Sequence, residues 1–313
     1  MLTKKQEFEL ITSISGRGEI PLKFAYIGTG AKNWDAYSRM VAKKGIHQME
    51  QELLDKRLID FLRSFSGKKL NIMDLGCGNG TSVLPIIEVA QKQGFEVRYS
   101  PIDISQELLN LAEKTVHERF PKIEIIKKEA DFEAGNLSDF TYSLTKGGYS
   151  NLFIFFGNTI GNFSDPNRVL SNFRDSMGLD DYMLIGTELE NLSKTNLILE
   201  NYRGNPLVAA LLMNVPKEIG ITEKDCDYEI TWNDKEQQVE IRITMKNDTT
   251  LKTGTETITM HKYEQILLAR SKKYTENTIT SLLSGAGFRN ELLTTDKERS
   301  YVLTLVQPTR YNI

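Results

Sequence analysis

The chain has 313 residues, of which 40% are hydrophobic and 26% are charged. Its 39 Lys and Arg residues nearly balance its 42 Asp and Glu residues, so the net charge is −3. This composition excludes a chain that is disordered throughout, and the near-neutral charge argues against nucleic acid as the main partner. The length allows either two domains or one enlarged domain.

Cysteines and histidines are few and widely spaced. The two cysteines are Cys77 and Cys226, and the three histidines do not combine with them into a zinc-binding spacing. The N-terminus lacks the apolar run of a signal peptide, and no stretch approaches the roughly 18 apolar residues that span a bilayer. We therefore expect a cytoplasmic protein with reduced thiols, no metal and no membrane contact. No feature of the sequence indicates an oligomeric state.

In chain order, the first half of the sequence alternates between helical and extended patterns. Apolar residues at helical spacing predict an amphipathic helix over about 50–66. A short apolar run then ends in a glycine-rich turn at 76–80, and helical spacing resumes after it. Further strands are expected to end near 103, 131 and 157, with helices over 106–120 and about 165–177, before a strand over 182–189. This alternation predicts an α/β fold with a parallel sheet covered on both faces.

The pattern changes in the second half of the chain. Residues 226–233, 238–246 and 255–269 are extended segments, and their connections are rich in Asn and Asp. A helix over 275–286 and a strand over 301–307 follow. We predict a Rossmann-like core from 46–204 and 275–313, and an added α+β substrate-binding domain from 1–45 and 205–274.

The strongest local motif is the turn from Asp74 to Thr81, which contains Gly76, Gly78 and Gly80. Glycines allow the backbone to approach a ligand closely. A dinucleotide-binding fingerprint would need a glycine where Thr81 stands, so that interpretation fails. The D-L-G-x-G-x-G pattern resembles motif I of S-adenosylmethionine-dependent methyltransferases.

Acidic residues follow the next two predicted strands. Asp103 ends the second strand, where a carboxylate can accept hydrogen bonds from both ribose hydroxyls. Asp131 and Phe132 end the third strand, where the carboxylate can accept from an adenine amino group and the ring can cover the base. The alternatives are that Asp103 is a turn residue and that Phe132 belongs to the core.

Two glycines and two asparagines follow the fourth predicted strand, between Phe155 and Phe163. We assign Gly157 to the donor site. The side-chain oxygen of Asn162 can accept a hydrogen bond from a substrate amine. Alternatively, Asn162 caps the following helix, a role for which Ser164 and Asp165 compete.

The chain as a whole resembles the histidine Nα-methyltransferases of the ergothioneine pathway. The matching segments are Pro21-Leu22-Lys23-Phe24-Ala25-Tyr26, Gly157-Asn158-Thr159-Ile160-Gly161-Asn162, Gly186-Thr187-Glu188, Asn201-Tyr202 and Ser271-Lys272-Lys273-Tyr274. This resemblance implies a methyltransferase core with a second domain that closes over an amino-acid substrate.

The resemblance also implies roles for individual residues. S-adenosylmethionine would be held by Gly76, Gly78, Asp103, Asp131 and Phe132, and S-adenosylhomocysteine would be the product. We add Asp74 and Gly80, like Gly157, to the predicted donor site. Asn162 would hold the substrate amine or carboxylate and act in catalysis with Tyr26. Tyr26 and Tyr202 would line the substrate pocket, and Ser271 would reach the far end of the substrate side chain.

The chain departs from the family pattern at two places. Where the family has Y-Y-P-T-R-T-E, this chain has Lys44-Gly45-Ile46-His47-Gln48-Met49-Glu50, which keeps only the glutamate. Where the family has an acid two positions before the serine, this chain has Ala269. That acid pairs with the imidazole of the substrate, so its loss argues against histidine as the acceptor.

The predicted function is methyl transfer from S-adenosylmethionine to nitrogen on a small amine or amino acid. Two alternatives stay open at this stage. One is a catalytically idle relative that binds S-adenosylmethionine, since substrate contacts of the family are missing. The other is a nicotinamide-dependent oxidoreductase on the same topology, which the missing third fingerprint glycine disfavours.

Overall fold

The structure is a computed structural model that describes residues 2–42, 44–191, 195–253 and 256–309. The chain divides into two compact units. The core unit consists of Val41–Glu190 and Lys273–Ile313, and the accessory unit consists of Met1–Met40 and Asn191–Lys272. The division of the chain into domains made from the sequence, with the roles assigned to each part, stays a prediction.

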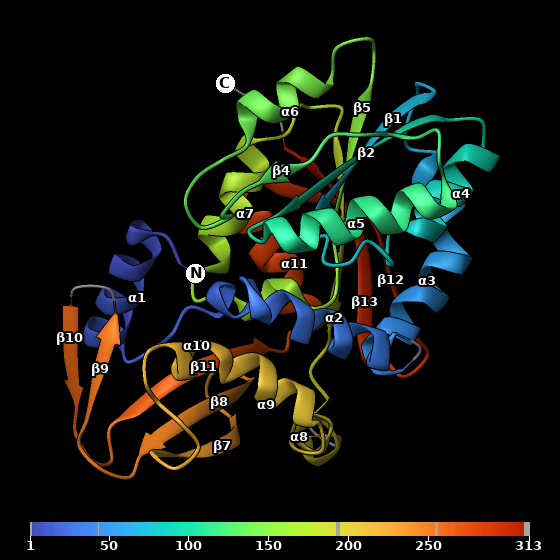
Figure 1. Ribbon diagram of the computed structural model, residues 1–313. Helices are drawn as coiled ribbons and strands as arrows, with labels where there is room; N and C mark the ends of the chain where they lie inside the picture. The colour runs from blue at the N-terminus through green and yellow to red at the C-terminus, as the bar shows by residue number, and fades with distance from the viewer. Residues whose placement is uncertain (1, 43, 192–194, 254–255, 310–313) are drawn as a thin grey trace. The chain divides into compact units, whose positions relative to one another are not determined.

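An eight-stranded sheet forms the centre of the core unit (Figure 1). Its strand order is β12-β13-β6-β5-β1-β2-β3, and β4 also pairs with β2. Strands β1 to β6 pair in parallel, whereas β13 is antiparallel to both β6 and β12. The bounds are β1 (Lys69–Leu75), β2 (Glu96–Asp103), β3 (Glu124–Ile125), β4 (Lys128–Glu129), β5 (Ser150–Phe155), β6 (Tyr182–Glu188), β12 (Phe288–Thr295) and β13 (Tyr301–Pro308). The predicted α/β class with a parallel-dominated sheet is confirmed.

The strand order reverses at β1. From β1 the chain proceeds to β2 and the outer strands on one side, then returns to β5 on the other side of β1. Ligands of open parallel sheets bind at such a reversal, beyond the carboxyl ends of the strands. The loops after β1 and β5 begin at Gly76 and Phe156, so the topology places the two predicted motifs at the same edge of the sheet.

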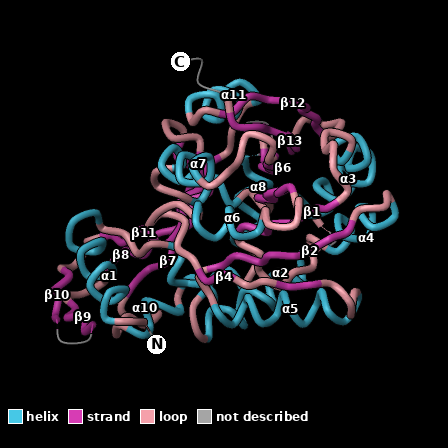
Figure 2. The backbone as a smooth tube through the Cα atoms, turned by 90° about the horizontal axis from the view of Figure 1, so that it is seen from above, coloured by secondary structure: helices cyan, strands magenta, loops and turns pink. Residues whose placement is uncertain are grey.

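Helices cover both faces of this sheet. Side chains of α3, α4 and α5 join one buried cluster with the sheet, and side chains of α6, α7 and α11 join another. Figure 2 shows α3 and α7 on opposite sides of strands β6 and β13. The helices are α3 (Gly45–Leu62), α4 (Leu84–Lys92), α5 (Gln106–Arg119), α6 (Ser138–Leu144), α7 (Pro166–Asp175) and α11 (Glu276–Gly285).

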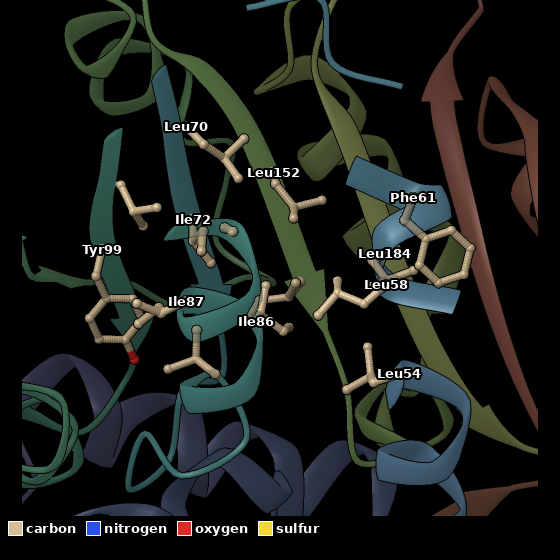
Figure 3. Close-up of a cluster of buried hydrophobic side chains, with 14 of the residues drawn as sticks. Leu54, Leu58, Phe61, Leu70, Ile72, Ile86, Ile87, Tyr99, Leu152 and Leu184 are labelled. Carbon is tan, nitrogen blue, oxygen red and sulfur yellow. The ribbon is translucent and has the colours of Figure 1, made fainter. Parts of the chain in front are cut away.

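Alternation along each strand directs side chains to the two clusters. On β1, Leu70 and Ile72 point toward α3 and α4, whereas Met73 and Leu75 belong to the opposite cluster. Figure 3 shows the first cluster, whose labelled members are Leu54, Leu58, Phe61, Leu70, Ile72, Ile86, Ile87, Tyr99, Leu152 and Leu184. Central parallel strands are buried on both faces, which explains their nearly continuous apolar sequences.

The structure corrects several predicted element boundaries in the core unit. The helix expected over 50–66 spans Gly45–Leu62, and the strand expected up to 131 is broken into β3 and β4. Sequence reasoning missed β12. Most of its residues are exposed because it is an edge strand, so it lacks the apolar alternation of a half-buried strand.

The accessory unit combines helices with a small antiparallel sheet of order β11-β8-β7 and a separate hairpin of β9 and β10. Buried side chains from its helices and sheet form one apolar cluster. Its elements are α1 (Lys4–Arg17), a 3-10 helix η1 (Leu22–Tyr26), α2 (Thr29–Val41), α8 (Thr195–Arg203), α9 (Pro206–Leu212), α10 (Asn214–Glu218), β7 (Cys226–Asn233), β8 (Gln238–Met245), β9 (Thr249–Thr253), β10 (Glu256–Met260) and β11 (Gln265–Lys272).

The extended segment expected over 255–269 forms parts of two strands with different partners. Strand β10 pairs with β9, whereas β11 pairs with β8. Between them Tyr263 has φ of +73°, and the backbone N–H of His261 donates to the Glu264 carboxylate at 2.8 Å. This tight turn interrupts a sequence whose apolar alternation had suggested one continuous strand.

Buried polar side chains connect three neighbouring strands of the core sheet. Asn71 on β1 donates to Asn151 on β5 at 2.9 Å and accepts from Ser100 on β2 at 2.9 Å. Asn151 in turn donates to Asp181 through its backbone and its side chain, at 2.9 and 3.0 Å. The buried amides are thereby satisfied, and the register at the amino ends of β1 and β5 is specified by polar contacts.

This network yields a stability prediction. Asn151→Ala should lower the free energy of unfolding by about 2–3 kcal/mol, because it leaves Asn71 and Asp181 with unsatisfied buried groups. Urea unfolding followed by circular dichroism measures the change. The exposed control Asn110→Ala should stay within about 0.5 kcal/mol of the parent protein; equal effects of the two substitutions would contradict the role of the network.

Candidate active site

The glycine turn after β1 adopts a backbone that only glycine enters readily. Gly76, Gly78 and Gly80 have φ values of +69°, +53° and +73°. The backbone N–H groups of Gly76 and Cys77 donate to the carbonyl of Ile102 on β2, at 2.8 and 3.2 Å. The turn is therefore attached to the end of the neighbouring strand.

The first and third glycines have different surroundings. A Cβ on Gly76 would lie 3.9 Å from the Phe132 ring and 4.0 Å from the Thr159 methyl group, which is ordinary contact distance. A Cβ on Gly80 would lie 2.8 Å from the Cα of Ala112 on α5. Close packing against α5 thus explains Gly80, whereas Gly76 lies beside the loops that follow β4 and β5. The assignment of these glycines to donor binding stays a prediction.

Asp103 is oriented by the glycine turn. Its carboxylate accepts from the backbone N–H of Gly78 at 3.2 Å and from that of Ser105 at 3.0 Å. The side chain is buried, and burial raises its pKa to about 6. A carboxylate has about four acceptor positions, so these two bonds leave capacity for hydroxyl groups of a ligand.

Two further buried carboxylates lie on the α3 face of the sheet. Asp74 on β1 accepts from the Tyr99 hydroxyl at 2.8 Å, and Glu50 on α3 accepts from the backbone N–H of Gly157 at 3.1 Å. Burial raises the pKa of each to about 7. The negative charges of Asp103 and Glu50 raise the pKa of Asp74 further, so Asp74 feels both of the other acids.

Sequence reasoning assigned no role to Glu50. The available signal was its retention as the single matching residue of the altered element 44–50. Its burial and its contact with the loop after β5 depend on how α3 packs against the sheet, which a local pattern does not contain.

Phe132 lies between the core and the glycine turn. Its ring makes edge-to-face contacts with Phe155 and Phe173, with centroids 6.4 and 5.1 Å apart. Asp131 accepts from the backbone N–H of Glu133 at 3.0 Å, which stabilises the turn after β4. The core contacts of Phe132 orient its ring beside Gly76, and its predicted role as a cover for the adenine is compatible with this position.

The loop after β5 is held from two sides. Gly157 and Asn158 have φ values of +71° and +61°. The Asn158 side-chain oxygen accepts from the Thr187 hydroxyl at 2.7 Å and from the backbone N–H of Glu188 at 3.1 Å, both on β6. With the Glu50 contact to Gly157, these bonds hold the start of the short 3-10 helix η2 (Thr159–Asn162).

Asn162 is the last residue of η2 and is partly buried. The N-cap of α7 is Asp165, which accepts from the backbone N–H of Arg168 at 3.0 Å. The alternative in which Asn162 caps that helix is therefore wrong. Within the described ranges, no residue forms a hydrogen bond with the Asn162 side chain, so its amide has acceptor and donor capacity for a ligand.

The late S-K-K-Y element contributes to both units. In the accessory unit, the Tyr202 hydroxyl on α8 donates to Ser271 on β11 at 3.0 Å. In the core unit, the buried Lys273 forms an ion pair with Glu188, and the Tyr274 hydroxyl donates to the carbonyl of Ile160 in η2 at 3.4 Å. Tyr26, at the end of η1, packs against the apolar cluster of the accessory unit, as does Tyr202.

Comparison with known proteins identifies the family. A model of the histidine-specific, SAM-dependent methyltransferases matches residues 6–308. The chain belongs to this family. It is a SAM-dependent methyltransferase, where SAM denotes S-adenosylmethionine.

Individual relatives of this methyltransferase are distant. The histidine N-alpha-methyltransferase of Mycolicibacterium smegmatis is 22% identical over 297 residues, which cover 91% of this chain and 89% of the relative. The magnesium protoporphyrin IX methyltransferase of Synechocystis PCC 6803, solved with bound SAH (S-adenosylhomocysteine), has a TM-score of 0.49 and 12% identity. The match covers 92% of this chain and 98% of that chain. A protein from Pyrococcus horikoshii has a TM-score of 0.47 and 17% identity, with coverage of 88% and 99%.

The residues of this methyltransferase fit SAM as cofactor. The turn exposes the backbone of Gly76 beside the Phe132 ring, and the amide of the buried Gly78 orients the Asp103 carboxylate. The sulfonium and ammonium groups of SAM together outweigh its carboxylate charge, so SAM suits a site with buried acids. Among the residues that the structure describes, no group of three or more His, Cys, Asp or Glu side chains could hold a metal ion. None of the described helices is long and apolar enough to span a membrane.

The pKa of Asp74 gives a prediction about stability in the absence of ligand. The raised pKa means that the folded protein retains a proton that the unfolded chain loses between about pH 4 and 7. The free energy of unfolding should therefore fall as pH rises through this range and level off above it. Chemical unfolding of the parent protein and of Asp74→Asn, whose side chain stays neutral, measures the change. The free energy of unfolding of the parent protein should fall relative to that of the variant as pH rises through this range. A difference between the two proteins that does not change with pH would contradict the buried, protonated state of Asp74.

Proposed function

We propose that this enzyme transfers the methyl group of SAM to nitrogen on a small amine or amino acid whose side chain is neutral, apolar or aromatic. The observation that carries the proposal is the environment of Ala269 on β11. In the register with β8, Ala269 lies opposite Ile241 and Ser271 lies opposite Val239. Opposite residues of an antiparallel pair share one face, and Ile241 and Val239 belong to the apolar cluster of the accessory unit.

This environment differs from what an imidazole substrate requires. The family resemblance predicts an acid at position 269, and the chain has a methyl group there instead. A polar ring that loses its carboxylate partner in an apolar setting keeps an unsatisfied group, which costs about 1–3 kcal/mol. A polar contact on this strand is the Tyr202–Ser271 pair, with 3.0 Å between its hydroxyl oxygens. That pair suits an acceptor with a single polar group at the end of its side chain.

The proposed mechanism depends on alignment of the acceptor nitrogen with the methyl group of SAM more than on acid–base catalysis. SAM supplies a sulfonium-bound methyl group, which is already activated for transfer to a nucleophile. The chain has to hold the acceptor nitrogen in line with that methyl group and in its neutral form. We assign the side-chain oxygen of Asn162 to accept a hydrogen bond from the amine, which orients the lone pair. Tyr26 is assigned to the same task, and the proton leaves to solvent.

Donor binding is assigned to residues at the carboxyl edge of the core sheet. Gly76 and Gly78 would place backbone against SAM, and Asp103 would accept from the ribose hydroxyls. Phe132 and Asp131 would contact the adenine. Three residues complete the predicted set. Gly157 lies in the loop after β5, Gly80 lies in the glycine turn, and Asp74 lies directly before that turn.

A panel assay tests the proposed function. The enzyme is incubated with methyl-labelled SAM and an amino-acid panel that includes histidine, aromatic and aliphatic members, together with simple amines. We expect labelled product with amines that carry neutral side chains and at least about tenfold lower kcat/KM with histidine, since a lost carboxylate contact is worth about 1.4 kcal/mol or more.

Other outcomes of the panel are equally informative. Donor binding without labelled product from any amine would overturn the proposal and favour an idle SAM-binding relative. Preference for histidine would overturn the proposed acceptor class. Ala269→Glu should shift the preference toward histidine, because it restores a carboxylate beside Ser271.

The Tyr202–Ser271 pair generates its own prediction. Ser271→Ala should lower kcat/KM for an acceptor with a polar side-chain end by about tenfold and leave the Kd of SAM within about twofold, because the lost contact concerns the acceptor. Steady-state kinetics and calorimetric SAM binding measure the two effects. Ser284→Ala, an exposed substitution on α11, serves as control. A parallel loss of SAM binding in Ser271→Ala would contradict the assignment.

A further inference from the structure

Glu50 is enclosed by groups from three other elements of the core unit. Its carboxylate accepts from the Gly157 amide at 3.1 Å and from the hydroxyl of Tyr301 on β13. On β6, a Cβ at Gly186 would lie 2.9 Å from a Glu50 oxygen and closer still to the Tyr301 hydroxyl, so a side chain at this position would displace the pair. Gly186 therefore leaves the space that the Glu50 side chain occupies, and Tyr301 donates a hydrogen bond to it.

The charge of Glu50 has no cationic partner in the part of the chain that the structure describes. Among the described residues, no Lys, Arg or His forms an ion pair with Glu50, Asp74 or Asp103. The titratable groups linked to Glu50 are Tyr301 on β13, which bonds to it, and Asp74 on β1, whose pKa its charge raises; Glu188 on β6 acts on Tyr301, and His47 lies one turn earlier on α3. Lys273, the buried cation of this region, is paired with Glu188. An uncompensated buried carboxylate is costly, which points to a cation supplied by a ligand.

The predicted donor site would bring the charged part of SAM close to this acid. The strands run in the order β2-β1-β5, and Asp103, the predicted ribose acceptor, ends β2. A donor that starts there and crosses the turn after β1 reaches the end of β5, where Glu50 holds the Gly157 amide. In SAM that end carries the sulfonium. When the acceptor nitrogen forms its bond to the methyl group and the sulfur–methyl bond breaks, the electron pair returns to sulfur and the product is a neutral thioether.

We propose that Glu50 is a positioning and donor-selecting residue, which fixes the loop at Gly157 and uses its uncompensated negative charge to favour cationic SAM over S-adenosylhomocysteine. Each turnover removes the positive charge that Glu50 stabilises, so product release becomes easier at the moment when the methyl group has left. The raised pKa of Glu50, about 7, agrees with this role, because the acid can take up a proton when no cation is bound.

The proposal predicts a coupling between donor binding and proton release. SAM binding should lower the pKa of Glu50, so SAM affinity should rise with pH through the range around 7, whereas the affinity for S-adenosylhomocysteine should change less. One pKa unit of coupling corresponds to about a tenfold change in affinity. Calorimetric titration of both ligands from about pH 6 to about pH 8 measures the affinity ratio, and titration in buffers of different ionisation enthalpy counts the protons released.

Two variants make the test specific. Glu50→Gln keeps the size and hydrogen-bonding capacity of the side chain without its charge, and should reduce the preference for SAM over S-adenosylhomocysteine by about tenfold at about pH 8. It should also weaken the dependence of this preference on pH, and the part that stays comes from Asp74 and from the ligands. Tyr301→Phe keeps the carboxylate but removes a hydrogen bond that lowers the Glu50 pKa, so the preference should persist with its midpoint at higher pH. Ionisation of the ligands is common to all three proteins and cancels in the comparison.

A purely structural role for Glu50 has a different signature. In that case Glu50→Gln would weaken the binding of SAM and of S-adenosylhomocysteine equally, and the pH dependence of their affinity ratio would stay unchanged. This result would overturn the proposal. If Glu50→Gln does not fold, the parent protein and Tyr301→Phe still decide the question: an affinity ratio independent of pH, without proton release on SAM binding, would overturn it. The parent protein should bind SAM whether or not the proposal for Glu50 holds. A parent protein that does not bind SAM would instead contradict the methyltransferase assignment.

Discussion

Three buried acids at the carboxyl edge of the core sheet, with no cationic partner among the described residues, are the constraint on which the rest of the site depends. Glu50, Asp74 and Asp103 each gain hydrogen bonds from backbone amides or tyrosine hydroxyls, and each has a raised pKa because burial outweighs those bonds. Hydrogen bonds compensate only part of the cost of removing a carboxylate from water. The edge of the sheet is therefore suited to a cationic ligand, in agreement with the SAM dependence of the family.

The same acids organise the loops. Asp103 bonds to the turn after β1, and Glu50 bonds to the loop after β5, so the two loops at the strand-order reversal are each attached to a carboxylate from a different element. Asn158 adds a third attachment to β6 through the Thr187 hydroxyl. A methyl-transfer site gains little from a strong base and much from rigid alignment, so these attachments suit the chemistry.

In the accessory unit, the proposed specificity rests on a change from a charged to an apolar environment. Ala269 and Ser271 on β11 lie on the same face of the sheet as core residues of β8. The hydroxyl of Tyr202 donates a hydrogen bond to Ser271. Under the proposed function, a change at this single strand position would alter which acceptor is stabilised without altering how SAM is bound, because the two tasks are assigned to different residues.

The sequence by itself determined the class of fold, the glycine turn, the acid that ends β2, the acid that follows β4, and the family. These features depend on local periodicity and on residue types at short spacing, which persist in the linear chain. It left open whether Asn162 caps a helix, and it missed the edge strand β12 and the turn that separates β10 from β11. Only the tertiary structure decided the role of Glu50, because its partners Gly157, Gly186 and Tyr301 lie more than 100 positions away and meet it only when α3 packs on the sheet.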